Sequence, residues 1–405
     1  MKWSEKVKEL AKKALNKPPA YGPPINVSKF RITSEIKDLQ TLLERPDVLE
    51  RMLSVGIDVK TKYKAGSFMQ FDEKVIKTLA GVSCVKIMSL EEAKGEFGEE
   101  WLEKYYWRAI GVDTDMFTAF VELYGKGGYV IIVEKNCRVE KPIQACLYLA
   151  TESFLQTPHN IIIIEDNAEA NLITGCTIGA HRGAHLGISE FYVGKNARLT
   201  FTMIHSWGPL VDVRPRTGVV VDEGGVFISN YISLRPVNTV QTFPKAVLKG
   251  EKASATFNTL IYGLGKSFYD LGAKAVLKAP KTSAQISSKV VAAGSSTVIS
   301  RGLIIAEADD VKGHYECRGL MLSDKASIRT IPELETKVKN AELTHEAAIG
   351  RINVNELAYL MSRGFTEEEA TAMIVKGFLE PEIPGLPYTL KMTIKKFTEI
   401  AARGL

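Results

Sequence analysis

Three side chains in the C-terminal third of the chain have the chemistry to hold iron. Cys317 lies in Gly313–Gly319, and the pair His345 and Glu346 follows further on. Thiolate is the preferred protein ligand of iron in clusters, imidazole can replace it, and carboxylate is a weaker, exchangeable oxygen donor. Taken alone, these residues carry little weight, because a single strand cysteine is more often a small core residue.

Two other patterns that could carry chemistry are incomplete. Gly263–Ser267 resembles the end of a phosphate-binding loop, but Leu260 stands where that loop needs its first glycine. We therefore expect no nucleotide hydrolysis by this chain. The acidic pair Asp309 and Asp310 does not by itself make the carboxylate groove of a β-helix enzyme acting on polysaccharides, so a carbohydrate enzyme is the weakest alternative.

Composition is that of a soluble globular protein. Of 405 residues, 45% are hydrophobic and 24% are charged, and the net charge is +5. The weak, dispersed positive charge argues against nucleic-acid binding. No segment is long and apolar enough to span a bilayer, and the N-terminus has an amphipathic pattern instead of a signal sequence. We expect a cytoplasmic protein with no membrane partner.

The cysteines are few and scattered. No two are close enough in sequence to suggest a zinc site, so we expect reduced thiols throughout. The five positions are Cys84, Cys137, Cys146, Cys176 and Cys317.

The first part of the chain, residues 1–115, is predicted to be mixed but largely helical. Amphipathic runs cover Lys2–Leu15, Glu35–Leu53 and Leu90–Tyr106. From about Phe117 the pattern changes to β-branched strands between turn signals.

A weak internal repeat follows, with a polar turn, a small residue and an alternating strand. It recurs roughly every 28 positions, at Glu169–Ile173, Asn196–Phe201, Gly224–Ile228, Lys252–Phe257 and Thr282–Ile286. A repeat of this length without a helical pattern favours one coil of a β-solenoid per unit. A β-sandwich is the alternative, but its Asn-Gly or Asp-Gly hairpin turns are absent. We therefore predict a mainly β protein with a parallel β-helix core over residues 116–350.

Residues 351–405 return to helical patterns. Asn353 is the predicted cap of a first helix, and Thr366 begins a second that Gly377 and Pro381 close. A third pattern runs over Tyr388–Ala402. These helices are expected to cap the solenoid or to form a docking surface.

Several motifs together resemble the SufB/SufD family. The C-terminal ones are Arg301–Leu303, His314–Cys317, Ala341–Gly350, Glu356–Gly364 and Ile374–Phe378. Matches in the family's order lie upstream at Lys64–Phe68, Met88–Ala93, Lys141–Gln144, Thr174–Thr177, His205–Trp207 and Asp270–Lys274. The cysteine followed by His-Glu is similar to the SufB branch.

The resemblance implies a right-handed parallel β-helix between helical N- and C-terminal domains. It also implies a non-enzymatic scaffold for iron–sulfur cluster assembly, with Cys317 binding the nascent cluster and His345 and Glu346 as accessory metal ligands. Cys176 matches a cysteine proposed to receive sulfur and pass it along the interior. His205 departs from the glutamine usual at its position, so the lining of that path is expected to differ.

The implied partners are a SufC-type ATPase on the C-terminal helices, a sulfur donor and recipient apo-proteins. The cluster is expected to be 2Fe-2S or 4Fe-4S. Because such a cluster takes about four protein ligands, we expect a homodimer with a shared site, the rival being a heterodimer with a SufD-like chain. The alternative function is a SufD-like structural subunit without its own cluster.

Overall fold

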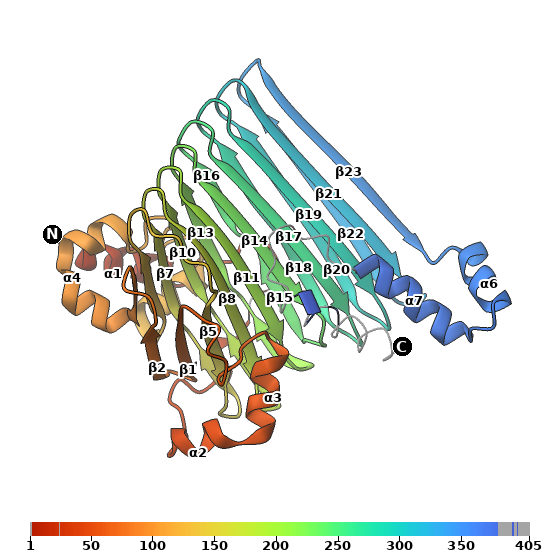
Figure 1. Cartoon of the computed structure of the whole chain (residues 1–405), viewed down its shortest axis with the longest axis horizontal. Coiled ribbons are helices and arrows are strands. Elements are labelled where there is room, and N and C mark those ends of the chain that lie inside the picture. Colours follow the sequence, from red (N-terminus) through yellow and green to blue (C-terminus); the bar gives the residue numbers. More distant parts are fainter. Residues whose placement is uncertain (1, 24, 380–390, 393–394, 396–405) are drawn as a thin grey trace.

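The structure is a computed structural model that describes residues 2–23, 25–379, 391–392 and 395. Its centre is a parallel β-solenoid of about eight turns, with helices at both ends of the chain (Figure 1). This confirms the predicted β-helix core and the helical ends.

Two sheets form the walls of the solenoid. The first sheet has the strand order β2-β1-β5-β8-β11-β14-β17-β19-β21-β23. Its strands are β1 (Gly66–Phe71), β2 (Lys74–Ala80), β5 (Ile143–Leu149), β8 (Glu169–Ile178), β11 (Arg198–Ser206), β14 (Val226–Ser233), β17 (Ser254–Gly263), β19 (Ser283–Ala292), β21 (Val311–Met321) and β23 (Ala341–Arg351).

The second sheet closes each coil from the other side, and in the early coils its strands are split in two. Its strands are β3 (Val85–Ser89), β4 (Tyr129–Val133), β6 (Phe154–Gln156), β7 (His159–Ile164), β9 (Arg182–His185), β10 (Ile188–Val193), β12 (Leu210–Val213), β13 (Arg216–Val221), β15 (Thr239–Thr242), β16 (Lys245–Leu248), β18 (Phe268–Leu277), β20 (Thr297–Ala306) and β22 (Ser327–Thr336).

The turns that enter the first sheet explain the sequence repeat. One residue in each has a positive φ, a conformation that asparagine and glycine adopt more readily than other residues. Side chains of successive turns also bond, as where Asn167 Nδ2 donates to Asn136 Oδ1 at 3.0 Å. The positive-φ residues are Asn136, Asn167, Asn196, Gly224, Lys252, Lys281 and Asp310.

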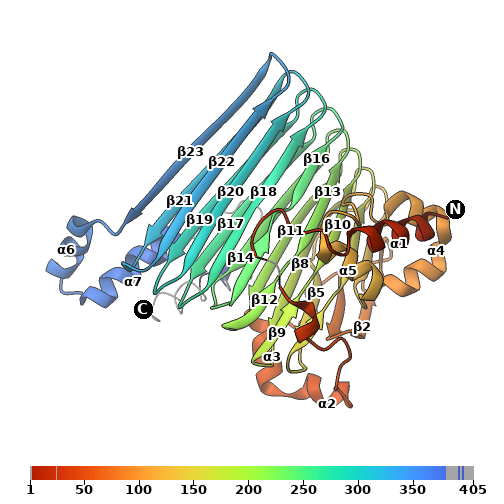
Figure 2. The ribbon, with the colours of Figure 1, turned by 180° about the vertical axis from the view of Figure 1, so that it is seen from behind.

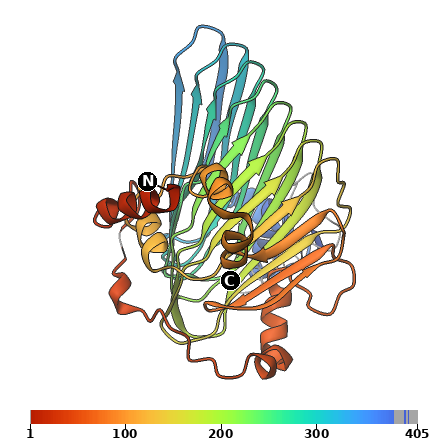
Figure 3. The same cartoon turned by 90° about the vertical axis from the view of Figure 1, so that its left-hand side faces the viewer.

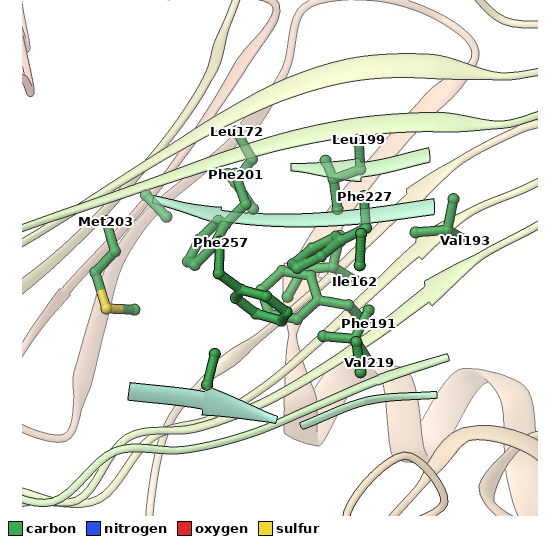
Figure 4. Close-up of a cluster of buried hydrophobic side chains, with 14 of the residues drawn as sticks. Ile162, Leu172, Phe191, Val193, Leu199, Phe201, Met203, Val219, Phe227 and Phe257 are labelled. Carbon is green, nitrogen blue, oxygen red and sulfur yellow. The ribbon is translucent and has the colours of Figure 1, made fainter. Parts of the chain in front are cut away.

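Apolar side chains from both sheets fill the interior. Phe191 of the second sheet packs on Phe201 and Phe227 of the first, with ring centroids 4.7 and 5.3 Å apart. Figure 4 shows Phe191, Phe227 and Phe257 packed together, with Met203 set apart from them. The phenyl rings therefore fill one part of the interior and leave Met203 beside another.

Helices cover parts of both outer faces (Figures 2 and 3). Those of the N-terminal region that pack on the second sheet are α1 (Trp3–Ala14), α4 (Leu90–Tyr105) and α5 (Met116–Tyr124). Two helices, α3 (Pro46–Ser54) and α7 (Glu367–Leu379), pack on the first sheet. The 3-10 helix η1 (Val27–Lys29) and α2 (Leu39–Glu44) precede α3, and α6 (Val354–Ser362) precedes α7. No helix in the described ranges is long and apolar enough to cross a membrane.

Two expectations are corrected. The chain does not turn to strands at Phe117, because α5 occupies that segment and β1–β3 come earlier. Helix α7 spans Glu367–Leu379, in agreement with the predicted closure by Gly377 and Pro381. The predicted cap at Asn353 is confirmed, since its side chain accepts a hydrogen bond from the Asn355 amide. The predicted helix over 388–402 lies almost wholly outside the described residues.

The second correction concerns the cysteines. Cys84 and Cys137 form a disulfide, so the expectation of five reduced thiols is wrong. The two residues are 53 positions apart but become neighbours because β3 and β4 pair antiparallel, with Val85 opposite Val133. The remaining cysteines are free and buried.

Candidate metal and sulfur site

Cys317 lies on β21, the second strand from the end of the first sheet, and its side chain belongs to the interior core. It has 0% exposure. In register, it stands between Ser288 of β19 and Ala347 of β23. The thiol is thus separated from the end of the solenoid by a single strand.

His345 and Glu346 are neighbours on β23, but their side chains face opposite sides, as successive residues of a strand do. His345 is in register with the buried Tyr315 and faces the inner side, whereas Glu346 is in register with Glu316 on the outer side. Both are exposed, because β23 is the last strand of its sheet.

The structure therefore brings Cys317 and His345 to one face and leaves Glu346 on the other. Within the described ranges, no group of three or more histidine, cysteine, aspartate or glutamate side chains is arranged to hold a metal ion. One chain presents two of the three predicted ligands together.

Tyr315 is the main neighbour of the thiol on its own strand. Its hydroxyl lies 3.0 Å from Ser300 Oγ and 2.8 Å from Thr330 Oγ1. Burial, together with the nearby Cys317, raises the pKa of Tyr315 to about 12. The ring packs against Gly302, where an added Cβ would lie 2.1 Å from a ring carbon. A neutral phenol is therefore held in place beside Cys317.

The second predicted pair, Cys176 and His205, is brought together. The two residues are in register on β8 and β11, and both are buried. Burial, and then the nearby Cys146, raises the pKa of the Cys176 thiol well above its ordinary value. Cys146 belongs to the separate cluster under α3. Cys176 is therefore a protonated interior thiol.

Aromatic and histidine side chains surround His205. Its Nδ1 lies 2.9 Å from the Tyr231 hydroxyl, and its ring centroid is 5.3 Å from that of Trp207 and 6.1 Å from that of His185. Burial lowers the pKa of His205 well below its ordinary value and that of His185 to about 3. Both imidazoles are neutral. In the described part of the chain, His205 Nε2 and Trp207 Nε1 have no hydrogen-bond partner.

A line of interior side chains, here called the interior column, connects this cluster with Cys317. A cavity of about 40 Å³ lies against three of its members, Met203, Tyr231 and Thr259. Ser288 Oγ, next to Cys317, is buried without a hydrogen-bond partner in the described ranges. The strand register places the column on β8, β11, β14, β17, β19 and β21, as Thr174, Met203, Tyr231, Thr259, Ser288 and Cys317.

Sequence reasoning missed Tyr231, Thr259 and Ser288 as members of this line. The signal was present, because stepping from Cys317 toward the N-terminus by one repeat at a time reaches each of them. It was hidden because hydroxyl residues are common and the repeat length varies slightly between coils.

Helix α6 presents apolar side chains to solvent. Val354, Tyr359 and Met361 are 75%, 58% and 44% exposed. On α7, Met373 is also exposed, whereas Phe378 packs with the outer core of the first sheet. Only part of the apolar surface of α6 and α7 is therefore used in packing.

Comparison with known proteins agrees with this architecture. Residues 147–378 match the model described as "SUF system FeS cluster assembly, SufBD core domain", and residues 65–145 match "SufBD protein N-terminal region". The chain belongs to the SufBD family. The core match spans the interior column and the strands that carry the predicted ligands.

Relatives of similar length support the assignment. An "Iron-sulfur cluster assembly SufBD family protein" of Methanothermobacter thermautotrophicus is 40% identical over 98% of both chains. One from Archaeoglobus fulgidus is 44% identical over 88% of this chain and 95% of the relative. One from Pyrococcus horikoshii is 34% identical over 99% and 93%. The similarity to proteins named for iron–sulfur cluster assembly thus extends over most of each chain.

Proposed function

We propose that this SufBD protein is a SufB-type scaffold that holds a nascent iron–sulfur cluster at a subunit interface and works with a SufC-type ATPase. The observation that supports the proposal is the position of Cys317 and His345, on the inner face of the last two strands of the first sheet. The cluster, of two or four irons, is the cargo of the scaffold. The protein's role is binding, without a reaction of its own.

A single chain supplies too few ligands. A cluster takes about four protein ligands, and Cys317 with His345 makes two. A twofold dimer doubles the set, because an isologous interface brings the same patch of each chain together. The free edge of β23 suits such pairing, since no described strand bonds to its far side. Glu346, on the outer face, would serve as an accessory ligand from the outer side of the dimer interface.

A heterodimer with a SufD-like chain is the rival assembly, and a SufD-like structural subunit is the rival function. A chain that served only as a structural partner would need no thiol at the subunit interface. The presence of Cys317 next to the edge strand therefore favours the SufB-type role.

We place the ATPase on α6 and α7. Gly263–Ser267 cannot bind nucleotide as a phosphate loop does, because a strand, β18, follows it in place of a helix. The exposed apolar side chains of α6, such as Val354 and Tyr359, are of the kind that marks interaction surfaces. If two ATPase subunits close on ATP, they would pull the helices that follow β23 and thereby loosen the dimer interface.

The ATPase proposal is tested by pull-down with the doubly substituted chain Val354→Glu, Tyr359→Glu. Both side chains are exposed, so folding should be kept while ATPase binding is lost. Leu210→Glu, at a residue that is 55% exposed on β12, is the matched control. Retention of the ATPase by the double variant would place the docking surface elsewhere.

Cys176 and His205 are proposed as the start of a sulfur path that ends at Cys317. The interior column supports this, because its members follow one another along the inside of the solenoid from β8 to β21, and the cavity lies against three of them. Sulfur from a donor would pass to Cys317 at the subunit interface. Finished clusters would then be transferred to recipient apo-proteins. A cytoplasmic location belongs to the same proposal.

Anaerobic reconstitution with ferrous iron and sulfide tests the scaffold function. Mössbauer spectra would give the number of irons, and light scattering with and without the ATPase would give the oligomeric state. A chain that binds no cluster, or that stays a monomer under both conditions, would overturn the homodimeric scaffold.

A further inference from the structure

Lysines at the N-terminal end of the solenoid have no acidic partner. Lys60, Lys62 and Lys77 are exposed, and within the described ranges none of them forms an ion pair. Asp58, just before this run of lysines, accepts hydrogen bonds from the backbone amides of Lys60 and Thr61. The positive charge at this end is therefore not compensated by a contact within the chain.

Lysines farther along the solenoid differ, because they pair with acidic side chains of the neighbouring coil. Lys195 Nζ lies 3.4 Å from Glu223 Oε2, and Lys281 Nζ lies 3.0 Å from Glu251 Oε1. Such exposed pairs contribute little to stability, but they offset the positive charge of the lysines. The unpaired lysines set the N-terminal end apart from these coils.

The unpaired lysines belong to a larger group. The Lys64 ammonium donates to two backbone carbonyls, and burial, followed by the nearby ammonium of Lys77, lowers the pKa of Lys64. Lys141 Nζ lies 5.6 Å from the centroid of the Tyr63 ring, which is 56% exposed. The group, here called the basic patch, consists of Lys60, Lys62, Lys64, Lys77 and Lys141.

Strand β2 gives the basic patch a free backbone edge. It is the first strand of its sheet and, among the described strands, pairs within that sheet only with β1. Val75 and Leu79 on β2 are 37% and 43% exposed. Lys77 is in register with Met69, which packs in the outer cluster of the first sheet beneath α3, so Lys77 and Leu79 lie on the outer side.

An extended acidic segment fits these features together. Its backbone would pair with the free edge of β2, its apolar residues would cover Val75 and Leu79, and its carboxylates would meet the lysines. A second copy of β2 fits poorly, because Lys77 would then meet like charge. Nucleic acid would use the charge but leave the strand edge unpaired.

We propose that the free edge of β2 and the basic patch form a docking site for an acidic, extended segment of a partner protein, which adds as a strand to the first sheet. This inference goes beyond the scaffold function and does not depend on it. The site lies at the opposite end of the solenoid from β23 and the neighbouring Cys317 (Figure 1).

Fluorescence anisotropy with the full chain tests the proposal. The probe is a fluorescein-labelled peptide of seven residues, the length of β2, in which glutamate and valine alternate. The wild type should bind it, and the affinity should fall as salt rises. The same peptide with a central proline keeps most of its charge but lacks one backbone donor, so it should bind ~10-fold more weakly.

A pair of double variants tests the basic patch. Lys62→Ala, Lys77→Ala should bind the peptide ~10-fold more weakly than the wild type, because two charge contacts are lost. Lys266→Ala, Lys325→Ala removes the same charge at two other exposed lysines and should match the wild type. Lys62→Gln, Lys77→Gln replaces the alanine variant if that variant does not fold.

Hydrogen exchange read by mass spectrometry tests the strand pairing. Exchange in residues 74–80 should slow when the peptide binds, because amides at the free edge of β2 become hydrogen-bonded. Equal peptide binding by the two double variants, or unchanged exchange in β2, would overturn the proposal. Binding of a single-stranded oligonucleotide or of anionic lipid vesicles, without binding of the peptide, would also overturn it.

Discussion

Replacing Cys317 with serine should remove the cluster and leave the fold intact. The side chain is fully buried, and a buried hydroxyl without a partner costs about 1–3 kcal/mol. Here a partner is available, because Ser288 Oγ is in register on the adjacent strand and is itself unpaired in the described ranges. The new hydroxyl and Ser288 can satisfy each other, so the net loss of unfolding free energy should be only ~0–1 kcal/mol.

Such a loss would lower the melting temperature by no more than about 2–4 °C, the shift expected for 1 kcal/mol in a domain of 150–250 residues. Cluster binding should change far more, because the strongest ligand of the set is gone. We expect at least ~10-fold weaker retention, or about 1.4 kcal/mol per lost factor of ten. Iron and acid-labile sulfide would be measured after gel filtration, and the melting temperature by circular dichroism.

Cys146→Ser is the matched control. This cysteine is equally buried, and burial raises its pKa to about 12, but it packs in the outer cluster and not in the interior column. Its substitution should leave the cluster content unchanged. Full cluster retention by Cys317→Ser, or equal loss in both variants, would show that the inner face of β21 is not the ligand site.

Three further predictions follow from the packing. Burial lowers the pKa of His185 from 6.5 to about 3, so on acidification the unfolded chain takes up this proton before the folded chain does. Lowering the pH from 7 to 5.5 should therefore cost about 1 kcal/mol of unfolding free energy. His185→Gln should reduce this pH dependence of the unfolding free energy, measured by urea titration. Gly302→Ala would meet a tyrosine ring at 2.1 Å and should cost about 1–3 kcal/mol, whereas Gly350→Ala, with no atom within 4 Å, should be silent. Thiol titration of the denatured, unreduced chain should count three thiols and not five. The Cys84–Cys137 disulfide closes a loop of 53 residues, so its reduction should lower the unfolding free energy by about 4 kcal/mol.

Local patterns predicted the elements where a single stretch of sequence contains the whole cause. The amphipathic run near the N-terminus forms α1, and Thr366 and Glu369 make the reciprocal capping bonds that begin α7. The prediction failed at Phe117, because an apolar segment of nine residues fits a buried helix as well as a strand. Packing of α5 against α1 and the second sheet decides the matter there.

Pairings across long separations could not be predicted in the same way. The disulfide depends on β3 and β4 meeting as antiparallel neighbours after a loop that contains α4 and α5. Periodicity within either segment carries no information about that partner. The free thiols were predicted correctly only at Cys146, Cys176 and Cys317.

The sequence by itself determined the solenoid, since each coil repeats the same turn chemistry and the same alternation of apolar residues, and it supplied the candidate ligands for iron and sulfur. Only the tertiary structure decided how those residues are arranged. Strand register sets Cys176 beside His205 and aligns Cys317 with Ser288, while strand alternation sends His345 and Glu346 to opposite faces. Register depends on how neighbouring coils stack, a long-range property that a list of residues and spacings does not contain.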